Sequence, residues 1–171
     1  MKKFTILAMI SLAILSSISC AGGKKEAPRA AAGPVAWMGW DQALAAADAD
    51  AKFVVVDVYT DWCGWCKVMD EKTYSDPAVS ELMQKSFVAV KLNAEGNKTV
   101  SYLGKGYTET ELARSFNVSG YPTTIFLGSD GSVLEKIPGY IEAPIFKKVL
   151  DYFDSDSYKN TSLDQYITGK Q

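Results

Sequence analysis

The chain of 171 residues contains no histidine. This absence excludes Ser–His–Asp and Cys–His catalysis, zinc sites built on imidazole and histidine ligation of haem, since each of them requires an imidazole ring. The other residue types are balanced as in a soluble globular protein, with 47% hydrophobic and 22% charged residues. The length suffices for one domain of ordinary size.

Basic residues are scarce beyond the first 33 positions. The formal net charge of the whole chain is −2 at pH 7. Residues 1–33 hold five of the 18 Lys and Arg but only one of the 20 Asp and Glu, so the remainder carries 13 basic and 19 acidic residues, a net charge of −6. Proteins that bind nucleic acids need clustered positive charge. The sequence therefore predicts no nucleic-acid partner.

Cysteine is scarce too, and Cys20 stands apart from the other two, Cys63 and Cys66. A basic start and an apolar run over residues 1–19 are typical of a secretory signal, and this run is short for a membrane-spanning helix. Residues 15–20 resemble a bacterial lipobox, in which the cysteine is lipidated and becomes the mature N-terminus. Because Ser17 stands where the lipobox usually has leucine, an ordinary signal peptide ending near Cys20 is the alternative. We expect a signal peptide over 1–19 and a lipid-anchored flexible tether over 20–33.

The rest of the chain predicts alternating helices and strands. We expect helices at 40–51, 63–72, 78–85, 109–116 and 143–153, and strands at 53–59, 87–92, 123–127 and 133–137, with a short strand at 35–37 and a polar stretch at 93–108. The run FVVVDVY at 53–59 is apolar without alternation, which indicates a central strand covered on both faces. These elements predict one α/β domain over 34–155, with a central mixed sheet, helices on both faces, and a terminal β-hairpin and helix. A polar tail at 156–171 follows.

Cys63 and Cys66 lie at the start of a predicted helix, directly after the buried strand. Two cysteines at this spacing can close a small disulfide ring, and the N–H groups of a helix N-terminus favour a thiolate on the first sulfur. The thiolate is the nucleophile in disulfide exchange. We predict Cys63 as the exposed attacking cysteine and Cys66 as the buried cysteine that resolves the mixed disulfide.

Two other interpretations of this pair remain open. The spacing also occurs in half of a zinc site, but a mononuclear site would need two further ligands from carboxylates or from a second subunit. A plain structural disulfide is possible in an oxidising compartment. The structural disulfide would make no use of the flanking Trp62 and Trp65 or of the position at the helix start. Because the chain has no histidine and only one other cysteine, Cys20, we predict no metal site.

Several separated positions resemble the thioredoxin-like family over nearly all of residues 53–153. They are the motif Trp62-Cys63-Gly64-Trp65-Cys66-Lys67, Asp57 six positions before Cys63, Lys91, the segment Gly120-Tyr121-Pro122-Thr123, and Gly139. The likeness extends to periplasmic members with a WCGWCK or WCxxCK motif, including the C-terminal domain of the DsbD family. It implies a thioredoxin fold in which Lys91 neighbours a buried acid and a cis-proline, Pro122, faces the active-site disulfide. The chain departs from thioredoxin in having Gly64-Trp65 between its cysteines and a longer connection at 96–108.

Asp57 interrupts an apolar strand, so we expect its carboxyl group to be buried and its pKa to be raised. A buried carboxylate with a raised pKa suits a proton acceptor for Cys66. The alternative is a structural acid that only pairs with Lys91.

On the substrate side, we predict binding by the residues around the sulfurs. Trp62, Gly64 and Trp65 would form an apolar docking surface, although core packing is the alternative for the two tryptophans. A cis-Pro122 would leave the backbone of Tyr121 free to pair with an extended substrate.

The sequence thus predicts a thiol–disulfide oxidoreductase of the bacterial cell envelope, lipid-anchored to the membrane by Cys20. It would act as a monomer, reduce disulfides in exported proteins and receive electrons from a membrane or periplasmic thiol donor. No dissociable cofactor is expected. A thioredoxin-fold binding module with a stable, non-catalytic disulfide is the competing hypothesis.

Overall fold

The structure is a computed structural model that describes residues 34–169. The predicted signal peptide at 1–19 and the tether at 20–33, with Cys20, lie outside the described residues. Predictions about lipidation and the tether therefore stay predictions.

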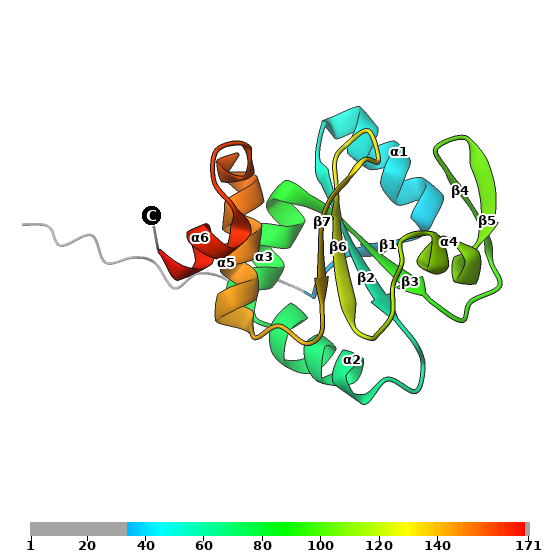
Figure 1. The fold of residues 1–171 in the computed structure, drawn as a ribbon, viewed down its shortest axis with the longest axis horizontal. Helices are drawn as coiled ribbons and strands as arrows, with labels where there is room; N and C mark the ends of the chain where they lie inside the picture. The colour runs from blue at the N-terminus through cyan, green and yellow to red at the C-terminus, as the bar shows by residue number, and fades with distance from the viewer. Residues whose placement is uncertain (1–33, 170–171) are drawn as a thin grey trace, which may run out of the picture. The chain divides into compact units, whose positions relative to one another are not determined.

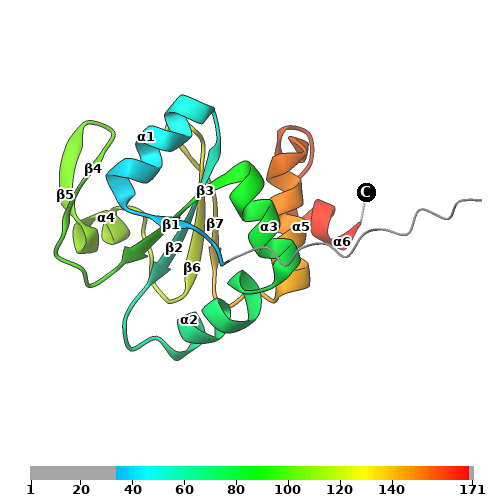
Figure 2. The same ribbon diagram turned by 180° about the vertical axis from the view of Figure 1, so that it is seen from behind.

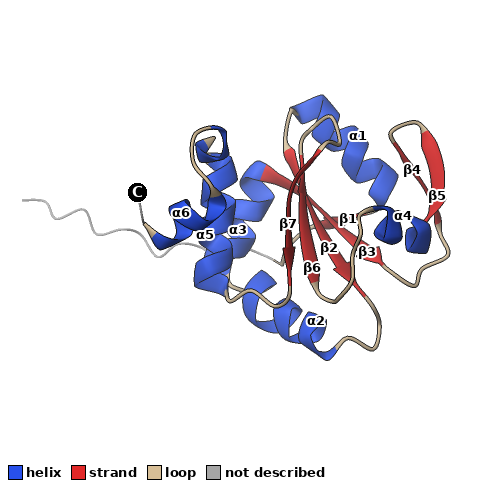
Figure 3. Ribbon diagram, viewed as in Figure 1, coloured by secondary structure: helices blue, strands red, loops and turns tan. Residues whose placement is uncertain are grey.

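The described chain contains strands and helices interspersed along its length (Figures 1 and 3). The strands are β1 (Trp37–Met38), β2 (Phe53–Tyr59), β3 (Phe87–Asn93), β4 (Thr99–Tyr102), β5 (Lys105–Thr108), β6 (Thr123–Leu127) and β7 (Val133–Pro138). The α-helices are α1 (Trp40–Asp50), α2 (Gly64–Met69), α3 (Pro77–Ser86), α4 (Glu109–Ser115), α5 (Ala143–Asp154) and α6 (Leu163–Thr168), with a π-helical turn η1 (Asp70–Tyr74) and a 3₁₀ turn η2 (Ser157–Lys159).

The central sheet has five strands in the order β1-β3-β2-β6-β7. β1, β3 and β2 are parallel, whereas β6 and β7 are antiparallel to their neighbours. The predicted mixed sheet and terminal hairpin are therefore confirmed. Sequence neighbours β2 and β3 pair in full register from Phe53↔Phe87 to Tyr59↔Asn93, so their carboxyl ends meet at one edge.

Helices cover both faces of this sheet, as Figures 1 and 2 show from opposite sides. Because side chains alternate along a strand, β2 contributes to two cores. Val54, Val56 and Val58 pack with α1 and α4, while Val55 packs with α2, α3 and α5. The prediction of a central strand covered on both faces is confirmed, since the five inner residues of β2 are all buried.

The helix starts follow from local side-chain chemistry. Asp76 caps α3 by accepting hydrogen bonds from the N–H groups of Ala78 and Val79, and Pro77 occupies the first turn. Thr108 and Glu111 form a capping box at the start of α4. The predicted helix at 63–72 is present as α2 and then widens into the π-helical turn η1.

The stretch at 93–108, which was predicted only as polar, contains the hairpin of β4 and β5. Val100 and Tyr102 alternate with exposed residues and reach the core beside α1, where the Tyr102 ring contacts Trp40 and Phe116. The turn uses positive φ angles at Leu103 and Gly104. Two apolar residues in four give too short an alternation to predict a strand from sequence alone.

The predicted polar tail also contains regular structure. Its helix α6 begins with a capping box between Ser162 and Gln165, and its Tyr166 ring lies 5.3 Å from that of Tyr152 in α5. Leu163 and Ile167 pack against the same core cluster. The tail is therefore amphipathic up to Thr168, and describing it as polar was wrong for its inner face.

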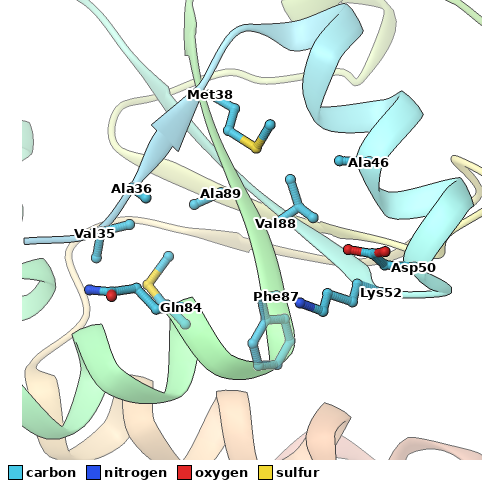
Figure 4. A pocket seen from close by; sticks show the side chains of 11 residues that line it. Val35, Ala36, Met38, Ala46, Asp50, Lys52, Gln84, Phe87, Val88 and Ala89 are labelled. Atoms are coloured by element: carbon cyan, nitrogen blue, oxygen red, sulfur yellow. The ribbon is translucent and has the colours of Figure 1, made fainter. Parts of the chain in front are cut away.

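A pocket of about 390 Å³ lies where β1 runs along β3 (Figure 4). Apolar side chains and Gln84 line it, with Asp50 and Lys52 at one end. Phe87 and Phe53 are paired at the amino ends of β3 and β2, whereas Cys63 follows the carboxyl end of β2. The pocket is thus at the opposite end of the sheet from the two cysteines. Over residues 34–169, none of the helices combines the length and apolar character needed to span a membrane.

Candidate active site

The two cysteines sit where the central strand β2 turns into α2. Cys63 is the N-cap residue of α2, and its N–H donates to the carbonyl oxygen of Thr60 over 3.1 Å. Cys63 and Cys66 are joined by a disulfide bond. The N–H of Cys66, one of the unpaired donors at a helix start, donates to Sγ of Cys63 over 3.1 Å. The same N–H would stabilise a thiolate on Cys63 after reduction.

Cys63 is not exposed in this oxidised form, contrary to the prediction: 3% of its surface is accessible, against 4% for Cys66. In this form the Cys63 sulfur is bonded to that of Cys66 and accepts a hydrogen bond from the N–H of Cys66. The neighbouring Trp62 and Trp65 are exposed instead. Cys66 is buried as predicted.

Asp57, Lys91 and Thr124 lie side by side across three strands, because Asp57 pairs in register with both of the others. They occupy the face of the sheet on which α2 packs, the face to which Val55 also points. Asp57 is 1% exposed, and its Oδ2 accepts a hydrogen bond from Nζ of Lys91 at 2.8 Å. The predicted burial of Asp57 and its pairing with Lys91 are both present.

Lys91 also binds a second carboxylate, which was missed by the sequence analysis. Its Nζ lies 2.6 Å from Oδ1 of Asp70, at the start of η1 and one helical turn beyond Cys66. The rings of Trp37, Tyr59 and Tyr74 surround the same ammonium group at 4.9, 5.1 and 5.8 Å. Lys91 thus ties the buried acid of β2 to the segment that carries Cys66.

Burial controls the electrostatics of this cluster. It raises the pKa of Asp57, and the attraction of Lys91 opposes that rise only in part. The pKa of Lys91 is raised because its pairing with Asp57 and Asp70 outweighs its own burial. Burial, and then the charge of Asp57, raise the pKa of the Tyr74 phenol. Asp57 Oδ1, Tyr74 OH and Thr124 Oγ1 are buried without a hydrogen bond of ordinary geometry among the described residues.

The two tryptophans beside the cysteines are exposed on the surface. This exposure fits the predicted docking surface and does not fit the alternative, in which the tryptophans pack in the core. Trp62 is 67% exposed and Trp65 is 60% exposed. The Trp62 ring meets Tyr121 edge to face at 5.9 Å, and its Nε1–H donates to the carboxylate of Glu95 at 3.1 Å. The Trp65 ring lies 5.4 Å from that of Tyr140. Each tryptophan therefore contacts a tyrosine from a loop elsewhere in the chain.

Of the remaining predicted substrate-binding residues, Tyr121 and Pro122 lie in the loop before β6, and Gly64 is the first residue of α2. The Tyr121–Pro122 peptide bond is cis, as the resemblance implied, and Pro122 is buried while Tyr121 is half-buried. The N–H of Gly139, at φ +88°, donates to the carbonyl oxygen of Pro122 over 2.8 Å. Gly64 is exposed, with open space where a Cβ would stand.

Two sulfurs in a reversible bond, a helix N-terminus at the first, and a buried acid with a raised pKa provide the groups that disulfide exchange needs. Within residues 34–169, no three His, Cys, Asp or Glu side chains are grouped so that they could hold a metal ion. The structure joins the two sulfurs to each other.

Comparisons with known proteins agree with this geometry. The Thioredoxin-like domain family matches residues 40–154. The thiol:disulfide interchange protein DsbD of Cronobacter sakazakii is 32% identical over 108 residues, which are 62% of this chain and 17% of that protein. The chain thus spans about a sixth of the length of the curated relatives it matches.

Solved structures give the same fold. A thioredoxin from Thermus thermophilus is 27% identical with a TM-score of 0.58, and the match covers 71% of this chain and 88% of that one. A putative disulphide-isomerase from Bacteroides thetaiotaomicron is also 27% identical, with a TM-score of 0.57 and coverages of 78% and 99%.

At the level of the family, these likenesses support thiol–disulfide oxidoreductase chemistry. The family match spans the cysteine pair, α5 and the strands β2, β3, β6 and β7 of the central sheet, and leaves out only the edge strand β1. Because the family match agrees with the sheet order and with the site, we conclude that the chain belongs to the thioredoxin-like family.

Proposed function

We propose that this chain is a protein-disulfide reductase of the bacterial cell envelope, anchored by a lipid on Cys20. The observation that carries the proposal is the Cys63–Cys66 disulfide at the start of α2, with an exposed tryptophan on each side of Cys63 and with the buried Asp57, paired with Lys91, on the face of the sheet that α2 covers. The resemblance of the motif to the DsbD family supports the periplasmic location.

The reduced protein would donate two electrons and two protons. The Cys63 thiolate attacks one sulfur of a substrate disulfide, forming a mixed disulfide and releasing the first substrate thiolate. Cys66 then loses its proton towards Asp57 and attacks the Cys63 sulfur, which re-forms the Cys63–Cys66 disulfide and releases the second substrate thiolate. Protons from the protein and the solvent neutralise the two released thiolates. A membrane or periplasmic dithiol donor would then reduce the protein again.

The residues around the sulfurs favour the reducing direction. A disulfide is a strong oxidant when its thiolate form is specially stabilised. Gly64 and Trp65 carry no charge, and a helix N-terminus contributes about 1 kcal/mol or less, below the ~1.4 kcal/mol of one pKa unit. The exposed Asp61, two residues before Cys63, opposes thiolate formation.

We therefore expect the midpoint potential of the Cys63–Cys66 couple to be closer to that of thioredoxin, about −270 mV, than to that of strong oxidants, about −120 mV. Equilibration with a dithiothreitol or glutathione series, followed by alkylation and mass spectrometry, measures it. A midpoint above about −180 mV would make the protein an oxidase or isomerase. A disulfide that stays closed throughout would favour the binding module.

Lipid anchoring has its own test. In the native host, Cys20→Ser is expected to move the exported protein from the membrane fraction to the soluble fraction, because the thiol that receives the lipid is gone. Immunoblotting of the two fractions checks this, with Cys66→Ser as the control that keeps the anchor. If Cys20→Ser still sediments with membranes, residues 1–19 are a retained anchor instead of a cleaved signal.

A further inference from the structure

An apolar groove of about 360 Å³ opens between the end of β7, the start of α5 and the helix α6. Its walls include Ile137, Tyr140, Ile145, Leu163 and Ile167. Glu142 is the one charged residue among those that line it. Ile145 is 37% exposed, and Leu163 and Ile167 are half-buried, so apolar surface faces the solvent here.

This groove is continuous with the surface around the disulfide. Tyr140, which lines the groove, contacts the ring of Trp65, and Trp65 directly precedes Cys66. Pro138 lies opposite Thr123 in the β6–β7 pairing, and the next residue, Gly139, binds the carbonyl oxygen of Pro122. The near end of the groove is therefore one aromatic ring away from the cysteine motif.

The far wall comes from a part of the chain outside the family match. That match ends at residue 154, whereas α6 spans Leu163–Thr168. The Tyr166–Tyr152 contact and the hydrogen bond from Nζ of Lys148 to the carbonyl oxygen of Ile167 fix α6 on α5. The surface formed by the edge strand β7 and by α5 thus becomes a groove because α6 adds a second wall.

We propose that this groove, which we call the α6 groove, binds an extended apolar segment of the substrate protein, a few residues from the cysteine that Cys63 attacks. The proposal rests on the proposed function. Extended chain advances about 3.3 Å per residue, so a segment lying over Trp65 and Tyr140 reaches the groove within about three to five residues. Apolar walls with one acidic residue accept aliphatic side chains and disfavour acidic ones.

The α6 groove thereby makes the reductase selective. Oxidised substrates that expose an apolar strand beside their disulfide, as incompletely folded exported proteins do, would react faster than compact or acidic ones. The exchange chemistry itself stays with Cys63 and Cys66.

Peptides carrying one cysteine as a mixed disulfide with thionitrobenzoate test this directly. Attack by the Cys63 thiolate on the peptide sulfur releases coloured thionitrobenzoate, and Cys66 then releases the peptide thiol. Three peptides of equal length carry two leucines three and five residues before the cysteine, the same leucines after it, or serines only. The mixed disulfide of glutathione and thionitrobenzoate is the small probe that cannot reach the groove.

For the reduced wild-type protein, we expect one leucine peptide to react about tenfold faster than the serine peptide, a difference of about 1.4 kcal/mol. Ile145→Glu and Ile167→Glu should each remove this preference while leaving the rate with the glutathione probe within twofold. Val133→Glu is the matched control, since Val133 is an exposed apolar residue at the opposite end of β7. It should keep the preference.

The outcomes separate the groove from the chemistry. If the glutathione probe reacts but the wild-type protein treats all three peptides alike, the α6 groove proposal is overturned and the proposed function stands. If the glutathione probe does not react, the proposed function itself fails. If gel filtration shows a dimer that Ile145→Glu dissociates without changing peptide rates, a second copy occupies the groove and the proposal is wrong.

Discussion

Cys63→Ser is expected to reduce disulfide exchange to the uncatalysed background, whereas Cys66→Ser should accumulate mixed disulfides with partner proteins. The reason is the order of the two steps. A hydroxyl at position 63 cannot make the first attack, because serine forms no disulfide with the substrate. A hydroxyl at position 66 permits the first attack but cannot expel the substrate in the second. Insulin reduction with dithiothreitol measures the first effect, and non-reducing gels of envelope extracts measure the second.

Cys20→Ser is the matched control for both variants, because it removes a cysteine outside the motif and should leave insulin reduction unchanged. Equal trapping by Cys63→Ser and Cys66→Ser would contradict the assigned order. Exposure does not distinguish the two cysteines, since both are buried in the disulfide form. The order then depends on Cys63 being the N-cap residue, whose sulfur receives the N–H of Cys66.

Asp57→Asn is expected to slow the resolving step by about tenfold to hundredfold, because Asn cannot accept the proton of Cys66. Rapid-mixing kinetics with a fluorescent mixed disulfide should show a first attack of nearly normal rate and a delayed release. The slowing should be greatest near neutral pH and should shrink at alkaline pH, where hydroxide can deprotonate Cys66. Asp48→Asn, on an exposed site of α1, is the control and should change neither step. An unchanged release rate in Asp57→Asn would leave Asp57 as a structural partner of Lys91.

The same substitution should make the oxidised protein relatively more stable as the pH rises. The pKa of Asp57 is raised in the folded state, so the unfolded chain releases this proton at lower pH than the folded protein does. The contribution of Asp57 to stability is therefore largest below 3.8, the ordinary pKa of an aspartate, and declines as the pH passes through the raised folded value. Asn does not titrate, and Lys91 keeps Asp70 as a partner.

Urea unfolding of the wild-type protein and Asp57→Asn across this pH range checks the sign. The free energy of unfolding of the variant, minus that of the wild type, should grow with pH. A difference that shrinks with pH would mean that Lys91 lowers the pKa of Asp57 below its usual value, against the burial seen here.

The central sheet could be predicted because its strands are local sequence signals. β2 is a continuous β-branched run, and β6 and β7 are joined by the turn-forming SDGS. β4 and β5 could not, since four-residue strands leave too few positions for alternation, and what stabilises them is contact with Trp40 and Phe116. The apolar face of α6 consists of three residues among polar ones, too few to predict a buried face from sequence. Their packing against the core that includes α5 shows that this face is partly buried.

The site divides in the same way. Cys63, Cys66 and the interruption at Asp57 are visible in the sequence because each breaks or marks an element. The sequence indicated only weakly that Asp70 belongs to the site, through its position four residues after Cys66 on the same helical face. It did not indicate Thr124 and Tyr140, because only strand pairing and loop packing bring them to Asp57 and Trp65. The burial of Cys63 could not be predicted, because the sequence motif does not show whether the disulfide is formed.

The central claim is that the Cys63–Cys66 pair passes its electrons to a protein disulfide. The most direct measurement mixes the reduced protein, freed of dithiothreitol, with excess oxidised insulin and follows both by alkylation and mass spectrometry. We predict that one Cys63–Cys66 disulfide forms for every two thiols that appear on insulin, and that Cys63→Ser forms neither. A dithiol that remains reduced while insulin keeps its disulfides would contradict the claim.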